Sequence, residues 1–279
     1  MSYKSILVQL DTGAHAHPRL EIALRLAHRF HARLTGLFTT YVPDRHAFFV
    51  MAGTADYYAA HERRRHEHAA ALERLFHAEL ARANVDGRWI GATGYANDIV
   101  PPYARLADLI VAGQTDRNDP ESFIADQFVE HLLMSAGRPV LLVPSSGSFA
   151  TPGQRVLVAW DGSREATRAI HDAMPFLSHA ANVTLLTVNA TRGEPPAWRI
   201  PGADIALTIA RHGVNVDVRE VGADSDTPIG DVLLSQAAES GCDLLVMGAY
   251  AHSRLHELVL GGATRTLLKS MTLPVLMSH

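Results

Sequence analysis

The sequence contains an internal repeat, and this repeat limits the fold more than any other feature. Three short apolar segments of the first half return in the same order in the second half. The matching pairs are SILVQLDTG (5–13) with RVLVAWDGS (155–163), ADLIVAG (107–113) with CDLLVMG (242–248), and RPVLLVP (138–144) with LPVLMSH (273–279). A segment rich in Pro, Ser and Gly, PSSGSFATPGQ (144–154), separates the halves and is typical of a linker. We therefore predict two domains of one fold, residues 1–144 and 154–279.

Each half alternates short apolar runs with segments whose apolar residues recur every three or four positions, such as Ile170, Met174 and Leu177. The strands predicted in the second half are residues 155–160, 183–189, 214–221, 243–248 and 274–277. Continuous apolar strands alternating with helices predict an α/β fold of two tandem Rossmann-like domains, each a five-stranded parallel sheet with helices on both faces. Ligands of such sheets bind outside the carboxyl ends of the strands.

The two halves differ in length. The segment between the landmarks Asp11 and Gly113 is longer than the equivalent segment between Asp161 and Gly248. Part of this excess is expected around residues 43–58, between the second strand and a long helical stretch.

Composition excludes several classes of function. The chain has 279 residues, of which 47% are apolar, which is enough for two buried cores. Charged residues are 19% and the formal net charge is -4, so we expect no nucleic-acid partner. No segment approaches the roughly 18 apolar residues of a membrane span, and the first apolar run is too short for a signal peptide, which predicts a cytoplasmic protein without membrane contact. Cys242 is the only cysteine, so neither a disulfide nor a thiolate metal cluster is expected, and we predict a buried thiol at a helix-to-strand junction.

Three segments of the second half carry a family resemblance: VLVAWDGS, VTLLTVNA and CDLLVMGAYAHSRLHELVLGGATRTLLKSMTLPVLM. In this succession the second half resembles a universal stress protein domain over its whole length, and the first half resembles one more distantly. The resemblance implies a five-stranded parallel sheet and the binding of ATP or a related adenine nucleotide, with Mg, without a dedicated metabolic reaction. It also implies the motif G-x2-G-x9-G-[ST] after the fourth strand and an Asp at the end of the first.

Carried over by position, the resemblance places Asp161 at the ribose and phosphates and the backbone around Val188 at the adenine. Gly248, Ala251, Gly261 and Gly262 fall on the glycine motif. The full set of expected nucleotide-binding residues is Asp161, Gly162, Ser163, Val188, Gly248, Ala251, His252, Gly261, Gly262, Ala263 and Thr264.

Two motif positions depart from the family pattern, because Ala251 replaces the second glycine and Gly262 replaces the hydroxyl residue. Glycine lets backbone N–H groups reach phosphate without a Cβ in the way. If position 251 needs left-handed geometry, alanine costs on the order of 1 kcal/mol. The missing hydroxyl removes a donor worth roughly 0.5 to 1.5 kcal/mol. Thr264 and Arg265, in the first turn of the next helix, are candidates to compensate.

The first half lacks the later glycine pair. After Gly113 it places Asp116, Asp119, Glu121 and Asp126 where phosphate is expected, and carboxylates repel phosphates at such range. We therefore predict a nucleotide site in the second half only.

The sixteen histidines invite a metal hypothesis, which their spacing does not favour. In HERRRHEH (61–68), the pair His61 and His66 is five residues apart, about 140° around a helix, so a solvated helix face is expected. His252 and His256 have better spacing within the glycine motif, where polar loop residues and a phosphate contact are the alternatives. His15 and His17 are expected in an exposed turn. No metal site is predicted.

No catalytic residues are predicted, because the sequence holds no GxSxG elbow, GxxxxGK[ST] loop or SGGxDS pyrophosphatase loop. The favoured hypothesis is a stress-response protein, not an enzyme, that binds an adenine nucleotide in the C-terminal domain and acts through an unidentified protein partner or through assembly. The alternatives are a scaffold or interaction protein that binds no nucleotide, and a weak ATP hydrolase. Association of two chains as a homodimer is left open.

Overall fold

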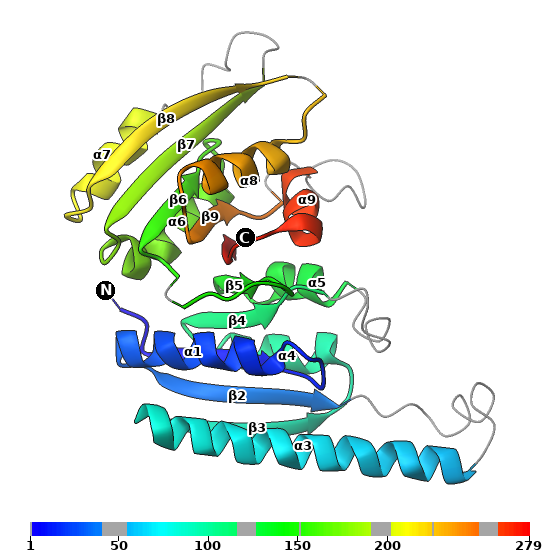
Figure 1. Cartoon of the computed structure of the whole chain (residues 1–279). Helices are drawn as coiled ribbons and strands as arrows, with labels where there is room; N and C mark the ends of the chain where they lie inside the picture. The colour runs from blue at the N-terminus through cyan, green and yellow to red at the C-terminus, as the bar shows by residue number, and fades with distance from the viewer. Residues whose placement is uncertain are drawn as a thin grey trace. The chain divides into compact units, whose positions relative to one another are not determined.

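The computed structural model describes residues 2–40, 55–115, 127–150, 152–190, 202–224, 226–250 and 262–279 (Figure 1). Contacts between residues divide the chain into two compact units that meet at Ala136 and Gly137. Each unit is an α/β structure, and each is described by itself below.

The N-terminal unit has four parallel strands in the order β3-β2-β1-β4. Its elements are β1 (Ser5–Leu10), α1 (Ala16–Phe30), β2 (Arg33–Thr40), α3 (Ala55–Ala83), β3 (Gly87–Thr93), α4 (Ala96–Ala104), β4 (Leu109–Gly113) and α5 (Phe128–Ser135). The strand order reverses direction between β1 and β4. This reversal creates a switch point, where the loops leave the carboxyl ends of β1 and β4 toward opposite faces.

The C-terminal unit has six strands in the order β5-β10-β9-β6-β7-β8. Its elements are β5 (Val140–Val143), β6 (Arg155–Ala159), α6 (Arg164–Leu177), β7 (Asn182–Ala190), α7 (Gly202–Ala210), β8 (Val216–Ala223), α8 (Ile229–Glu239), β9 (Leu244–Gly248), α9 (Gly262–Ser270) and β10 (Val275–Ser278). Strands β6 to β10 are all parallel, and their switch point lies between β6 and β9. Strand β5 pairs antiparallel with β10.

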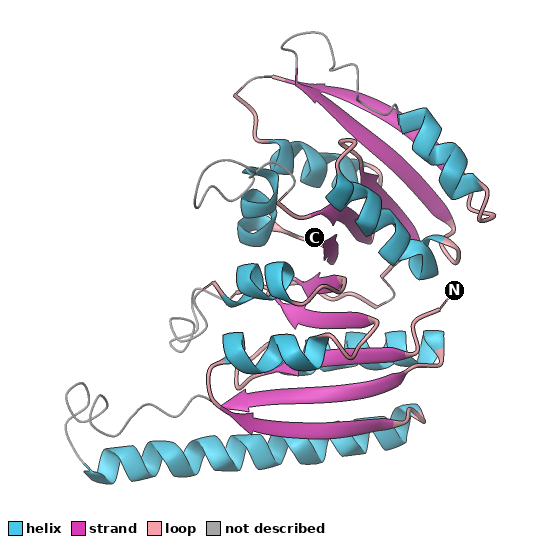
Figure 2. Ribbon diagram, turned by 180° about the vertical axis from the view of Figure 1, so that it is seen from behind, coloured by secondary structure: helices cyan, strands magenta, loops and turns pink. Residues whose placement is uncertain are grey.

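Helices cover both faces of each sheet, as Figure 2 shows. In the N-terminal unit α1 contacts α3 on one face, and α4 contacts α5 on the other. In the C-terminal unit α8 contacts α9, whereas α6 packs on β9 and β10. Crossovers between parallel strands are right-handed, so the helices change face where the strand order reverses.

Burial follows the position of each strand in its sheet. The central strands β1, β4, β6 and β9 supply buried Val, Leu and Ile side chains, whereas most residues of the edge strand β8 are exposed. Two equivalent aspartates hold the starts of the central strands. Asp108 accepts hydrogen bonds from the backbone N–H groups of Lys4 and Ser5 at 2.8 and 3.0 Å. Asp243 accepts them from Gly153, Gln154 and Arg155 at 2.7, 3.0 and 3.2 Å.

The α/β class and the two Rossmann-like repeats predicted from the sequence are confirmed. The strands predicted in the second half match the observed ones to within two residues at each end. The first half is longer in part because α3 has 29 residues, whereas the equivalent α7 has 9. Residues 43–54, where part of the excess was expected, lie outside the described residues, as do 191–201 in the second half.

Candidate functional site

The predicted site residues of the second repeat gather at the switch point of its sheet. Strands β6 and β9 are neighbours there, with Val158 opposite Val246. Asp161 follows the end of β6 and Gly248 ends β9. The crevice expected from the topology is therefore the place where these two residues lie.

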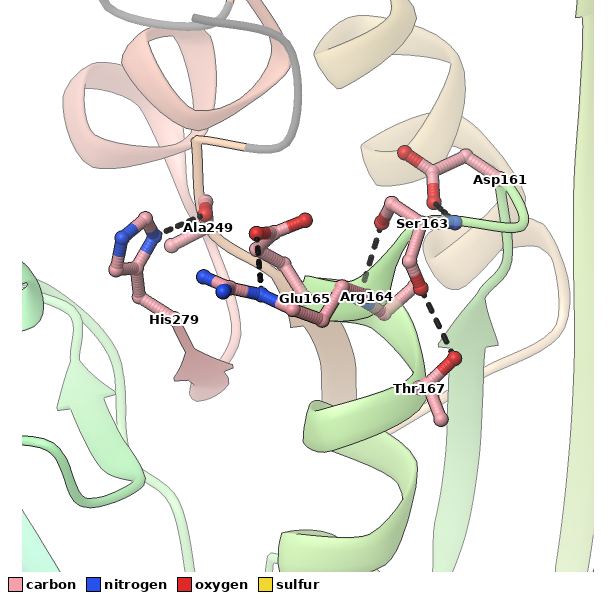
Figure 3. Close-up of polar contacts among 8 residues, drawn as sticks. Asp161, Ser163, Arg164, Glu165, Thr167, Ala249 and His279 are labelled. Atoms are coloured by element: carbon pink, nitrogen blue, oxygen red, sulfur yellow. Dashed lines mark hydrogen bonds and ion pairs between the residues drawn. The ribbon is translucent and has the colours of Figure 1, made fainter. Parts of the chain in front are cut away.

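The turn after β6 is built by its own side chains (Figure 3). The Asp161 carboxylate accepts a hydrogen bond from the Ser163 N–H at 2.9 Å, and Gly162 has a positive φ of 81°. Ser163 is the N-cap of α6, because its hydroxyl accepts from the Ala166 N–H at 3.1 Å. Asp161 is exposed.

Gly248 allows α6 to pack tightly on the end of β9. A Cβ at this position would lie 2.5 Å from the backbone nitrogen of Ala166 and 2.6 Å from the carbonyl carbon of Glu165. The Glu165 side chain lies over the same strand end and pairs with Arg164 at 3.2 Å. The glycine is therefore required by the packing of the helix, whatever binds in front of it.

The chain beyond Gly248 is held by two further contacts. The Tyr250 N–H donates to the Thr264 hydroxyl at 3.3 Å, and Tyr250 has a positive φ of 62°, which is rare for a non-glycine residue. The ring nitrogen Nδ1 of His279 lies 3.1 Å from the Ala249 carbonyl oxygen (Figure 3). Thr264 is 2% exposed, so its hydroxyl faces the protein and ties together the two ends of the glycine segment.

The remaining predicted residues are placed as follows. Ala251, His252 and Gly261 lie outside the described residues. Gly262 is the first residue of α9 and is exposed, and a Cβ added there would meet nothing within 4 Å; Ala263 follows it in the same turn. Val188 is half-buried in β7, opposite Val221 of β8.

The switch point of the first repeat is occupied by an arginine. Arg19 of α1 is 4% exposed and donates to the Asp11 carboxylate at 2.8 Å and to the Gln9 amide oxygen at 2.7 Å. Its guanidinium covers Gly113, because a Cβ at that glycine would lie 2.6 Å from Nη1. Asp11 also accepts from the Gly13 N–H at 3.0 Å.

These contacts set the ionisation of Asp11. Burial alone raises its pKa, but the charge and hydrogen bond of Arg19 act in the opposite direction, together with the Gly13 N–H and the Gln9 amide. The pKa of Asp11 is consequently lowered from its ordinary value, although its side chain remains 41% exposed. The carboxylate is thus charged and committed to a partner within the protein.

Both repeats match the same family model. The universal stress protein family model covers residues 2–144 and again 153–279. This chain belongs to the universal stress protein family. A universal stress protein of Synechocystis sp. is 24% identical over 192 residues, which are 66% of this chain and 62% of that protein, so the match spans less than two thirds of the relative's length.

A solved structure of similar fold spans both repeats. A universal stress protein from Archaeoglobus fulgidus is 17% identical, covers 98% of this chain and 95% of its own, and has a TM-score of 0.71. A universal stress protein solved in complex with cAMP covers 52% of this chain and 100% of its own, with 17% identity and a TM-score of 0.37.

The sequence did not single out Arg19. The expected reason for a closed first site was the acidic group Asp116, Asp119, Glu121 and Asp126, which lies outside the described residues. Arg19 could have been noticed as an arginine four residues into a strongly apolar helix face, but its burial depends on Gly113, far away in the sequence.

Other predicted features have mixed outcomes. Cys242 lies between α8 and β9 as predicted, but it is half-buried where a buried thiol was expected, because a cavity opens beside it. His66 and His68 are exposed on α3, as expected of a solvated face. His15 and His17 were expected in an exposed turn, but His15 is the half-buried N-cap residue of α1, and His17 is exposed within that helix. His252 and His256 lie outside the described residues. None of the helices in the described part of the chain is long and apolar enough to cross a membrane; the expected location stays a prediction.

Proposed function

We propose that this universal stress protein binds one adenine nucleotide such as ATP, with Mg, at the switch point of its second repeat. Binding acts by changing contacts with a protein partner or assembly, and the protein turns over no substrate. The observation that carries the proposal is the contrast between two equivalent aspartates. Asp161 stands exposed in a capped turn, whereas Asp11 is paired with the buried Arg19.

The second switch point offers groups that suit a nucleotide. The Asp161 carboxylate can accept hydrogen bonds from ribose hydroxyl groups, which are neutral donors. The N-terminal end of α9, starting at Gly262, carries backbone N–H groups of the kind that favour phosphate oxygens. The backbone of Val188, near the end of β7, is the expected neighbour of the base.

The first switch point offers none of these groups freely. Its guanidinium could attract phosphate in principle, but Arg19 is buried and already neutralised by Asp11. A ligand would have to break this pair, which leaves an uncompensated charge in a poorly hydrated place. We therefore expect one nucleotide per chain.

Titration calorimetry with ATP and magnesium tests the proposal. We expect a stoichiometry near one per chain, lost in Asp161→Ala and kept in the matched variant Asp204→Ala, which removes an equally exposed carboxylate from α7. Two equivalent sites, or binding unchanged by Asp161→Ala, would contradict the proposed site. No heat and no thermal protection at millimolar ATP would favour the scaffold function, and steady phosphate release that depends on Asp161 would favour the hydrolase.

A further inference from the structure

A second concave site lies at the opposite edge of the same sheet, where strands β6 and β7 begin. It is a cavity of about 370 Å³, large enough for a small molecule. Its lining residues are Arg155, Val156, Asn182, Thr184, Arg219, Glu239, Ser240 and Cys242. Seven of these eight carry a polar or ionisable side chain, which suits a polar ligand better than an apolar one.

Two guanidinium groups dominate the charge of the cavity. Arg219 donates to the Ser240 hydroxyl at 3.2 Å, which holds its side chain against the end of α8. Arg155, at the start of β6, comes close to the Gly241 backbone, since a Cβ at that glycine would lie 3.9 Å from its Nη1. Within the described part of the chain, neither guanidinium lies within ion-pair distance of a carboxylate.

The negative groups around the cavity are already engaged. The Glu239 carboxylate accepts from the Ser235 hydroxyl at 3.0 Å and from the Gln236 amide at 2.8 Å. The last carbonyl oxygens of α8 accept hydrogen bonds from the backbone N–H groups of Ser240, Gly241 and Cys242. The negative end of the helix is therefore capped, and the two carboxylates nearest the positive charges, Glu239 and Asp243, both already accept hydrogen bonds.

The first repeat carries different side chains at the positions of these charged groups. By strand register, Ser5 of the first repeat is equivalent to Arg155, and Ile90 is equivalent to Arg219. The residue equivalent to Cys242 is Ala107, which precedes Asp108 as Cys242 precedes Asp243. The first repeat instead carries Arg33 and Arg88 at the positions equivalent to Asn182 and Asp217, so the grouping of Arg155, Arg219 and Cys242 is particular to the second repeat.

We propose that this cavity binds a small anion with two acidic groups, phosphate or carboxylate, held between the guanidinium groups of Arg155 and Arg219. Guanidinium donates paired hydrogen bonds to either kind of oxyanion. The Asn182 amide and the Thr184 and Ser240 hydroxyls supply the neutral hydrogen-bonding groups around it. This site is separate from the switch point, so it does not depend on nucleotide binding there.

Cys242 makes the proposal directly measurable, because it lines the cavity and is the only cysteine of the chain. Burial raises the pKa of its thiol, and Asp243 adds to this, while Arg155 and Arg219 act in the opposite direction. Alkylation at neutral pH is consequently slow enough to follow. An anion seated on the arginines both covers the sulfur and opposes formation of the thiolate, so each effect slows the reaction.

The experiment follows alkylation of Cys242 in the full chain by iodoacetamide, using intact-protein mass spectrometry, with pyrophosphate, succinate or sodium chloride at equal ionic strength. We expect saturable slowing by pyrophosphate or succinate beyond that by chloride, and the stronger of the two identifies the acid group preferred. Arg155→Gln and Arg219→Gln should each raise the half-saturating concentration at least about fivefold, whereas Arg211→Gln, an exposed arginine of the same unit, should not.

Two further arms separate the explanations. In Asp161→Ala the slowing should persist, because the nucleotide site lies at the other edge of the sheet; its loss would contradict the proposal. Slowing no greater than that by chloride, or equal in wild type and both Gln variants, would also overturn it. Circular dichroism of each variant checks that the fold is retained, and a rise in Tm with pyrophosphate that is absent in Arg155→Gln gives a second measure of binding.

Discussion

The two switch points of this universal stress protein share one backbone arrangement but differ in the side chain that lies over the strand-end glycine. In the first repeat the helix residue above the strand-end glycine is Arg19, which is buried and paired with Asp11. In the second repeat the residue above the equivalent glycine is Glu165, whose partner Arg164 is largely exposed. The comparison teaches that a ligand crevice can be closed from within by a single side chain, while the strands and glycines that define it are kept.

Removal of Arg19 should have the largest effect on this comparison. Arg19→Met leaves Asp11 without its charged partner, so we expect the free energy of unfolding to fall by about 2 to 4 kcal/mol. The loss should lie toward the low end of the range for buried ion pairs, because the Asp11 side chain is 41% exposed. The matched change Glu165→Gln breaks a pair whose arginine is 71% exposed and whose glutamate is 12% exposed, and should cost about 1 kcal/mol. Urea denaturation measures both losses. Equal losses would contradict the conclusion that the ion pair at the first switch point is the more buried and more stabilising one.

The next largest effect should be a difference in stability between alanine variants of the two strand-end glycines. At Gly248 an added Cβ meets backbone atoms of α6, so Gly248→Ala should cost about 2 to 3 kcal/mol through a forced shift of the helix. At Gly113 it meets the end of the Arg19 side chain, which can move, so Gly113→Ala should cost about 1 kcal/mol. Thermal unfolding of the two variants checks the order, and the reverse order would show that Arg19 is held more rigidly than α6.

Acid should act on the first repeat through Asp11. Its folded-state pKa is lowered, so the pair contributes stability above the unfolded pKa of about 3.9, and this contribution is lost as pH falls through the folded value. In Arg19→Met the carboxylate has lost the partner that lowers its pKa, so the fall in stability below about pH 4 should be shallower. Urea midpoints between pH 2 and 6 measure the slope; identical slopes in wild type and variant would remove Arg19 as the cause.

The smallest expected effect is a gain in the affinity of the second site for ATP. Gly262→Ser restores the hydroxyl of the family motif at a position where the added atoms meet open space. We expect ATP to bind about 2-fold to 10-fold more tightly, the range of one hydrogen bond, with stability unchanged. Gly222→Ser, at another exposed glycine with open space around it, is the matched control. Equal affinity in both variants would mean that phosphate does not reach the start of α9.

The elements predicted best were those coded by neighbouring residues. The apolar run at residues 155–160 forms β6, Arg155–Ala159, because this strand depends on the local pattern of apolar residues. Long-range placements were not predicted. Asp108 binds the start of a strand 104 residues earlier, and Asp243 binds one 90 residues earlier. Nothing in either local pattern distinguishes them from other turn aspartates.

The candidate sites show the same limit. Gly248 was assigned to the ligand, and the structure shows that the packing of α6 already requires it. Thr264 was a candidate to replace the missing hydroxyl, and its side chain bonds the Tyr250 backbone instead. The convergence of Arg155, Arg219 and Cys242 comes from three elements brought together by the sheet, so no spacing in the sequence could reveal it.

The antiparallel pairing of β5 with β10 has a consequence for where this protein can be divided. Val275, Leu276 and Met277 are fully buried and pair with residues 140–142. A fragment that begins at residue 153, where the second family match starts, bares β10 as an apolar edge, and it should self-associate on size-exclusion chromatography. The compact unit begins at Gly137 and therefore includes β5 as the neighbour of β10. The sequence repeat that begins at residue 153 and the compact unit that begins at Gly137 therefore differ by one strand, β5.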